Sequence, residues 1–414
     1  MGRMVTGSAK RGKRARSWEQ IEPLQHLCQE GRLFEVQEWI ASGRPVNIPS
    51  KEPKRRVPPS PLSIAIESGF HSLAKLLLEA GALFESDLWD SPIRLALKQR
   101  RFDLAQLLVD YGLPMSEVDM CDVFDTWQPE IMEYFIERGA CPERDNALAY
   151  AFCRRIRTAL RILKKYEDRF PSFSSQVNIA LRHHAYEGNE KWVSLMLWAG
   201  GDPYDYGPSS YDGDTEDALQ YAAIDRAVWG RHINVLKILV KKPFDPDNHA
   251  VYKALTWGAA DHGSDFASLL IERGLKPSNH PKWSSDLIQH WLTQLDWVGH
   301  LWVRHADRKN LDREEARNVM KNIHLLAKHG AKWLPDNYQI GSVRRTLLKM
   351  TAAYTAETVW IMTKYRVCSP EVLRILLRTP TIRAHTYEHS LRMHRMIDQM
   401  EQASASVDLQ GQNM

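Results

Sequence analysis

The sequence predicts an all-helical fold in which short helix pairs stack in a row. The first observation behind this prediction is a repeated spacing, because the segments from Pro23 to Gly43, Pro61 to Gly81 and Pro92 to Gly112 each span 20 residues. The second is a run of apolar residues at helical spacing between these marks. Self-similarity at a period of about 30 residues is typical of a solenoid, in which each unit contacts only its neighbours.

One unit can be followed residue by residue over 60–84. Ser60 is placed to cap a helix that begins at Pro61, where a missing N–H costs nothing. Gly69 allows the left-handed conformation that ends this helix, and Gly81 ends a second, leucine-rich helix in the same way. Two helices of about 8 to 10 residues cannot bury their apolar sides alone, so each pair has to stack on the next.

The pattern S/T-P-L-x-x-A-x-x-x-G, followed by L-L-x-x-G-A, resembles the ankyrin repeat. Residues 60–82 match it closely, and the segments 23–43 and 92–112 match it well. Later segments are degenerate, and those ending at Gly139-Ala140, Gly274 and Gly330-Ala331 keep mainly the second helix and its turn. The segment from Ala180 to Gly200 keeps the 20-residue spacing, and residues 146–166 also form a unit, with Ala159-Leu160 and Ile162-Leu163 in its second helix. We count about nine units between residues 20 and 340, with a tenth near 342–366.

The sequence departs from the family in the T-P-L-H tetrapeptide. Its first position holds Glu22, Ser60 or Ser91, and its fourth holds Gln25, Ser63 or Arg94. The resemblance implies that the family's threonine and histidine hydrogen-bond neighbouring turns. We therefore expect looser or differently bonded junctions here, and an irregular central and C-terminal stack.

The predicted organisation is a flexible basic arm over 1–18, the ankyrin-like array over 19–340, an irregular C-terminal helical cap over 341–395 and a disordered tail over 396–414. Hydrophobic residues make up 43% of the chain and charged residues 26%, which suits a large buried core. No stretch approaches the roughly 20 apolar residues that cross a bilayer, so we expect no membrane insertion. The five scattered cysteines include no C-x-x-C pair, which argues against a disulfide framework and a zinc finger. We expect a cytoplasmic protein, or a nuclear one in a eukaryote.

Catalytic signatures are absent from the sequence: it contains no phosphate-binding P-loop, dinucleotide fingerprint, nucleophile elbow or kinase set. His385 and His389 fall in an H-x-x-E-H string, which could bind zinc but more often is an exposed histidine pair. The pair His183-His184 is more often packed than metal-binding. We therefore expect no enzyme activity and no cofactor.

Binding of another protein is the function that the resemblance implies. Ankyrin-like stacks hold partners in a groove lined by the ends of their first helices, and on the loops that project beside it. The residues matched to that groove are of mixed polarity, which favours a protein partner: Gln29, Glu30, Glu67, Ser68, Lys98, Gln99, Tyr186 and Glu187.

The segment 201–217 is the most unusual loop. It sets Tyr204, Tyr206 and Tyr211 among Gly, Ser and Asp, a composition typical of antibody-like binding loops. The alternative is a solvated acidic insertion with no partner.

Basic clusters support an alternative function, in which the protein associates with nucleic acid. The N-terminal arm and the loop near residue 55 could contact phosphates, although solvated charges are the more common outcome. The cations concerned are Arg11, Lys13, Arg14, Arg16, Lys54, Arg55 and Arg56.

Overall fold

The computed structural model describes residues 12–50, 58–84, 91–211, 221–241, 244–262, 264–304, 309–349, 352–379 and 392–402. Throughout these residues the regular structure is helical, and the β-structure is limited to two isolated bridges, Arg14 with Asn47 and Gly207 with Tyr221. The predicted all-α class is confirmed. The chain divides into two compact units, Met1–Gln176 and Val177–Met414.

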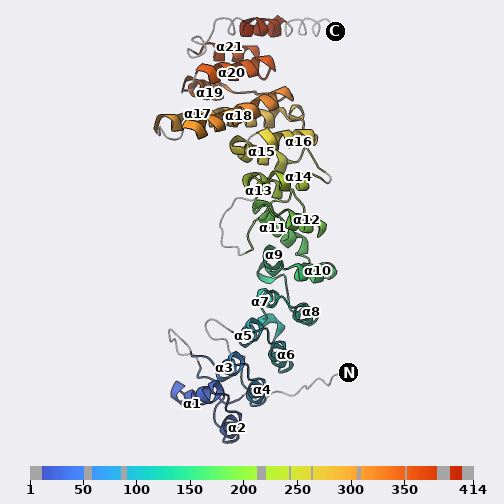
Figure 1. The fold of residues 1–414 in the computed structure, drawn as a ribbon, viewed down its shortest axis with the longest axis vertical. Coiled ribbons are helices and arrows are strands. Elements are labelled where there is room, and N and C mark those ends of the chain that lie inside the picture. Colours follow the sequence, from blue (N-terminus) through green and yellow to red (C-terminus); the bar gives the residue numbers. More distant parts are fainter. Residues whose placement is uncertain are drawn as a thin grey trace. The chain divides into compact units, whose positions relative to one another are not determined.

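The first unit is built of two rows of helices (Figure 1). The first row holds α1 (Trp18–Gln29), α3 (Pro61–Glu67), α5 (Pro92–Lys98), α7 (Met120–Asp125) and α9 (Ala147–Cys153). The second row holds α2 (Leu33–Ala41), α4 (His71–Glu79), α6 (Phe102–Asp110), α8 (Pro129–Glu137) and α10 (Arg157–Lys165), and three short 3-10 turns lie at Met115–Glu117, Arg144–Asn146 and Glu167–Arg169.

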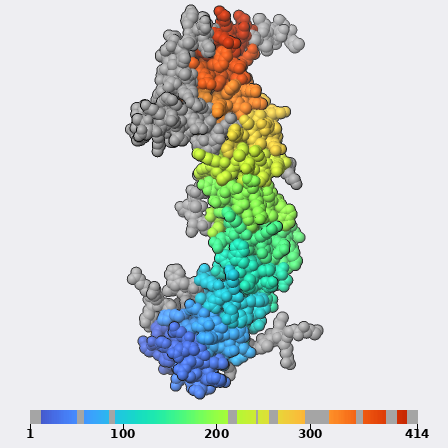
Figure 2. Space-filling view, viewed as in Figure 1, coloured from blue at the N-terminus to red at the C-terminus, as the bar shows by residue number. Residues whose placement is uncertain are grey.

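Each helix of the first row packs against the next helix of that row, from α1 through α9. The apolar residues predicted from helical spacing form the core, as Leu62 and Ile66 of α3 and Leu73 and Leu77 of α4 illustrate by being at most 2% exposed. In the space-filling view the colours of the first unit follow one another in sequence order over its surface (Figure 2).

The predicted helix boundaries of residues 60–84 are confirmed. The Ser60 hydroxyl accepts a hydrogen bond from the Ser63 N–H at 3.0 Å, and Pro61 is the first residue of α3. Gly69 and Gly81 end the two helices with φ of 75° and 84°. By contrast, α1 begins at Trp18, so Pro23 lies inside that helix.

A left-handed residue joins the first and second helix of each of several pairs, and we call this residue the hairpin tip. The tips and their φ angles are Gly31 (70°), Gly69 (75°), Arg100 (56°), Trp127 (60°), Arg155 (65°), Gly188 (72°) and Arg231 (64°). Glycine adopts this conformation freely, whereas other residues adopt it at a cost of roughly 1 kcal/mol. The left-handed tip therefore recurs at the same place in the helix pair even where the sequence has no glycine.

Gly188 is required for packing as well as for its backbone conformation. A Cβ atom added to Gly188 would lie 2.5 Å from the His232 ring. We predict that Gly188→Ala lowers the free energy of unfolding by about 2 kcal/mol, because a strained backbone is added to a displaced ring. Gly200 offers a matched control, since its φ is 105° and nothing lies within 4 Å of an added Cβ. Urea denaturation should therefore show a smaller loss, of about 1 kcal/mol, for Gly200→Ala; equal losses would contradict the packing role.

The second unit continues the paired arrangement with longer helices. Its helices are most of α11 (Phe173–Tyr186), then α12 (Glu190–Trp198), α13 (Ala223–Trp229), α14 (Ile233–Leu239), α15 (His249–His262), α16 (Ser264–Glu272), α17 (Pro281–Arg304), α18 (Lys309–Lys328), α19 (Asn337–Lys349), α20 (Ala352–Lys364), α21 (Pro370–Leu377) and a helix at 392–402, with a 3-10 turn at Pro277–Asn279. The lengths are irregular, from 7 residues in α13 to 24 in α17.

Two residues at the fourth tetrapeptide position bond to the next helix pair. The Gln25 side-chain amide donates to the Pro59 carbonyl at 2.7 Å, and Arg94 forms an ion pair with Asp122 at 3.2 Å. Ser63 instead bonds to Ser60 within its own helix end. The junctions are therefore differently bonded, as expected from the missing histidine.

Residues 12–17 of the predicted arm and residues 396–402 of the predicted tail have defined structure, in contrast to the prediction for these two stretches. Within the arm predicted to be flexible, residues 12–17 lie against the 43–48 loop, where the Ala15 N–H donates to the Asn47 carbonyl at 2.9 Å and Ala15 is buried. The Gly12 N–H also donates to the Gly81 carbonyl at 3.0 Å. The sequence did not predict these backbone pairings, because a run of cations is typical of a solvated arm. At the other end, the helix at 392–402 extends beyond the predicted boundary at 395, and it is anchored by the buried side chains of Met393 and Ile397.

Candidate partner-binding surface

The residues that the sequence assigns to the groove are exposed, at or just after the ends of α1, α3, α5 and α11. This holds for Gln29, Glu30, Glu67, Ser68, Lys98, Gln99, Tyr186 and Glu187. Two of them are brought together in the first unit, where the Gln99 side-chain amide donates to the Glu67 carbonyl at 2.5 Å. Tyr186 and Glu187 belong to the second unit, in which a more distinctive surface surrounds Tyr186.

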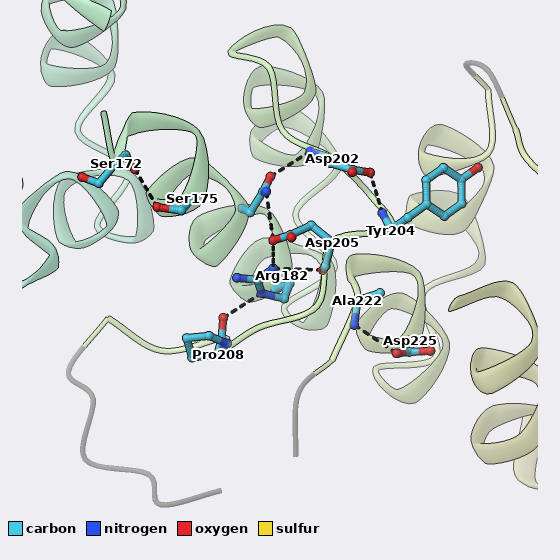
Figure 3. Close-up of polar contacts among 10 residues, drawn as sticks. Ser172, Ser175, Arg182, Asp202, Tyr204, Asp205, Pro208, Ala222 and Asp225 are labelled. Atoms are coloured by element: carbon cyan, nitrogen blue, oxygen red, sulfur yellow. Dashed lines mark hydrogen bonds and ion pairs between the residues drawn. The ribbon is translucent and has the colours of Figure 1, made fainter. Parts of the chain in front are cut away.

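The tyrosine loop, defined here as residues 201–211, is fastened to the second unit by Arg182 of α11 (Figure 3). The Arg182 side chain is only 3% exposed. Its Nε donates to the Pro208 carbonyl at 2.7 Å, and its Nη1 donates to the Asp205 carbonyl and carboxylate at 3.0 and 2.9 Å. Burial lowers the pKa of this guanidinium, and the paired Asp205 opposes that shift. The loop is therefore an ordered part of the unit as far as residue 211.

Asn178 anchors the same loop through two further hydrogen bonds. Its side-chain amide donates to the Asp205 carboxylate at 3.0 Å, and its carbonyl oxygen accepts from the Asp202 N–H at 2.8 Å. Gly207 pairs with Tyr221 through two backbone hydrogen bonds of 3.1 and 3.2 Å. The acidic residues Asp202 and Asp205 are thus part of the folded loop.

Two of the three predicted tyrosines contact residues at or just before the start of α15. The Tyr204 hydroxyl accepts a hydrogen bond from the Asp245 N–H at 3.0 Å, and the Tyr206 hydroxyl lies 3.4 Å from His249 Nδ1. Tyr211 is half-buried at the end of the described loop. Tyr204 and Tyr206 therefore stabilise the unit, which leaves less of their rings for a partner.

The aromatic cluster is the surface that the sequence interpretation missed. We define it as Tyr186, Tyr221, Arg226 and Trp229. The Arg226 guanidinium carbon lies 4.8, 4.6 and 5.3 Å from the ring centres of Tyr186, Tyr221 and Trp229. Arg226 also bonds to Ser209 of the tyrosine loop. Tyr186 is 43% exposed and Trp229 51% exposed, so these rings and the cation they enclose reach the surface.

The short helix α13 explains why the cluster forms. Ile224, Ala227 and Val228 are buried, which turns Arg226 and Trp229, three residues apart, toward the surface. Tyr186 comes from the C-terminal end of α11, and Tyr221 from the residue paired with Gly207. The spacing of Arg226 and Trp229 was available in the sequence, whereas the approach of Tyr186 and Tyr221 depends on packing.

Asp225 is a buried carboxylate beside the cluster. It is 6% exposed, its Oδ2 accepts from the Ala222 N–H at 3.0 Å, and its Oδ1 has no hydrogen-bond partner within the described part of the chain. Burial raises its pKa from 3.8 to about 6, although the Ala222 N–H, Lys253 and Arg226 oppose the rise. The folded protein therefore keeps a proton here between about pH 4 and pH 6 that the unfolded chain has lost.

We predict that Asp225→Asn stabilises the protein at high pH. Because the raised folded pKa means that stability falls as pH rises through this window, the ionised carboxylate costs stability above about pH 6. The variant should gain about 2 kcal/mol in urea denaturation at pH 8, and close to nothing at pH 4. Asp286→Asn, at an exposed site on α17, should change stability by less than about 0.5 kcal/mol at both pH values. A gain for Asp225→Asn that is independent of pH would contradict this explanation.

The structure describes three of the seven cations in the nucleic-acid alternative. Lys13 Nζ donates to the Gly43 carbonyl at 3.1 Å, and Arg14 Nη1 donates to the Ile48 carbonyl at 3.3 Å, so both are used inside the first unit. Arg16 is exposed. Arg11, Lys54, Arg55 and Arg56 lie outside the described residues.

Only one of the two histidine pairs, His183 with His184, lies in the described part of the chain. His184 is fully buried and packs on His183 and Trp192, with ring centres 5.1 and 5.4 Å away. Across the described residues, no group of three or more His, Cys, Asp or Glu side chains could hold a metal ion. His385 and His389 lie outside those residues.

No protein-family model matches the chain, and no match is found among curated proteins. In the portion of the chain that the structure describes, no helix is both long and apolar enough to cross a membrane.

Proposed function

We propose that this chain is a non-catalytic, ankyrin-type repeat protein that binds a partner protein. The proposed binding surface is the aromatic cluster of the second unit, and the exposed ends of the first-row helices are a separate candidate surface of the first unit. The proposal rests on the repeat spacing of the sequence and on the surface around Arg226. A cytoplasmic location, or a nuclear one in a eukaryote, is part of the proposal and is supported by five cysteines that are all free thiols.

One observation carries the proposal: Arg226 is enclosed by three aromatic rings, of which Tyr186 and Trp229 are about half exposed. Trp, Tyr and Arg are the residues most enriched where truncation weakens protein interfaces most. A rigid indole contributes a large contact area at a small entropic cost. The hydrogen bond from Arg226 to Ser209 and its packing against the rings hold the cluster in place before a partner arrives.

The same surroundings disfavour a nucleic-acid partner at this surface. Asp202 and Asp205 lie in the tyrosine loop, which contacts Arg226 through Ser209. These carboxylates would repel a phosphate chain, and phosphate contacts supply most of the affinity in nucleic-acid binding. Lys13 and Arg14 of the proposed basic arm are bonded within the first unit.

Capture from the native source tests this proposal. The full chain is used as bait in extract with and without nuclease, beside the variant Tyr186→Ala/Trp229→Ala. We expect the wild-type chain to retain one protein species in the presence of nuclease, and the double variant to lose it. Release of the captured material by nuclease would instead support the nucleic-acid alternative, and equal capture by the double variant would exclude the aromatic cluster.

A further inference from the structure

Three successive hairpin tips of the first unit carry large side chains. Arg100, Trp127 and Arg155 join α5 to α6, α7 to α8 and α9 to α10, with φ of 56°, 60° and 65°. Glycine adopts this conformation without strain, and it occupies the two preceding tips, Gly31 and Gly69. Non-glycine residues in strained conformations of this kind concentrate at functional sites.

Close packing explains why the first two tips are glycines. An added Cβ on Gly31 would lie 2.7 Å from the Phe70 ring, and one on Gly69 would lie 3.0 Å from the Arg101 guanidinium. In each case the residue that follows the next tip covers the glycine. Arg100, Trp127 and Arg155 are not covered in this way, since all three are exposed and Trp127 is 46% exposed. The absence of cover permits a large side chain at these tips but does not account for Arg, Trp and Arg.

The three tips follow one another along one edge of the unit. Contacts between α5 and α7, and between α7 and α9, hold their helices side by side. Side chains also bridge from one hairpin to the next: Arg154, beside the third tip, lies 3.6 Å from Asp125 near the second, and Tyr150 donates to Asp125 at 2.6 Å. One extended ligand could therefore contact all three tips.

Of the four arginines at and beside the first and third tips, two are paired with carboxylates of the described residues and two are not. Arg101 is bonded to Asp103 at 2.7 and 2.8 Å, and Arg154 is paired with Asp125. The Arg100 and Arg155 side chains make no hydrogen bond or ion pair with any described residue. Two unpaired guanidinium groups therefore flank a half-exposed indole.

We propose that Arg100, Trp127 and Arg155 form a docking ridge for an acidic polypeptide segment that carries an aromatic or aliphatic side chain between its carboxylates. Guanidinium groups bind carboxylates through paired, charge-assisted hydrogen bonds, and the indole supplies an apolar contact between them. Asp103 and Asp125 lie close to this ridge, because they pair with Arg101 and Arg154, the chain neighbours of Arg100 and Arg155. A phosphodiester chain, charged at every residue, would meet these carboxylates, whereas a peptide can place neutral residues opposite them.

Fluorescence anisotropy with the full chain tests the ridge. The probe is a short fluorescein-labelled peptide of repeated Glu-Glu-Phe, compared with a Lys-Lys-Phe peptide and labelled oligothymidine. The test variants are Arg100→Gly/Arg155→Gly and Trp127→Gly, because glycine fits a left-handed tip and the fold should be kept or stabilised. We expect tenfold or weaker binding of the acidic peptide by each variant, with an unchanged or higher Tm.

Arg231→Gly is the matched control, since Arg231 is an exposed, left-handed tip of the second unit. It should relieve the same strain and leave the affinity for the acidic peptide unchanged. The ridge would be refuted if the wild-type chain failed to bind the acidic peptide, or bound oligothymidine or the lysine peptide as tightly. It would also be refuted if Arg100→Gly/Arg155→Gly kept wild-type affinity, or if Arg231→Gly lost as much.

Discussion

Replacement of Arg182 by alanine is expected to destabilise the second unit by about 3 kcal/mol. The guanidinium is almost fully buried and donates to Pro208 and to both the backbone and the carboxylate of Asp205. Removing a buried charged partner typically costs 3 to 5 kcal/mol. The lower end of that range applies here, because the Asp205 side chain is 42% exposed and can be hydrated once Arg182 is gone.

Arg182→Ala should also release the tyrosine loop. Hydrogen exchange at the paired Gly207 and Tyr221 amides should accelerate more than exchange in α14, because the Arg182 side chain bonds to the tyrosine loop and not to α14. Arg182→Lys should be intermediate, because a single ammonium cannot reproduce the planar set of donors. Arg273→Ala removes an exposed arginine of the same unit and should cost less than about 0.5 kcal/mol. If Arg182→Ala and Arg273→Ala had similar denaturation midpoints, the loop would not depend on Arg182.

Replacement of Trp229 by alanine is expected to weaken binding of the captured partner about 30-fold or more. This corresponds to at least about 2 kcal/mol, the usual threshold for an interface residue that dominates affinity. The loss has two physical causes. The half-exposed indole itself would no longer contact the partner, and Arg226 would lose one of the three rings that hold its guanidinium in place.

The control for Trp229 is Trp198, which is 61% exposed at the end of α12. Trp198→Ala should change the affinity less than threefold, as measured by titration calorimetry on the purified partner, and both variants should keep the wild-type Tm within about 2 °C. Similar losses for the two tryptophan variants would mean that general surface apolarity, and not the aromatic cluster, carries the binding.

The helix pairs could be predicted from the sequence because their boundaries have local causes. Ser60 and Pro61 begin one helix and Gly69 ends it, and the structure shows the same boundaries. Apolar spacing was enough even for the unit near residue 150, where Ala159 and Leu163 are buried. Arg100 stands where the repeat has glycine and still adopts its left-handed conformation, because the helices on both sides fix the tip.

The aromatic cluster could not be predicted in the same way. Tyr186 and Trp229 are 43 residues apart, and they meet only because α11 and α13 fold into the same unit. The tyrosine loop resembled a free binding loop because its composition gives no sign of the buried Arg182 that fastens it. The composition of the arm likewise predicts flexibility and gives no sign that Ala15 pairs with Asn47. Each of these features depends on contacts between residues far apart in the chain.

Site-specific photo-crosslinking tests the central claim most directly. A benzophenone amino acid is placed at Tyr186 in the aromatic cluster or at Lys237, an exposed position on α14 of the same unit. The full chain is then irradiated in cells of its native source. The account predicts one discrete protein adduct from position 186, lost when Trp229→Ala is added, and no such adduct from position 237. Crosslinks from position 186 that go only to nucleic acid, or adducts that are the same from both positions, would contradict it.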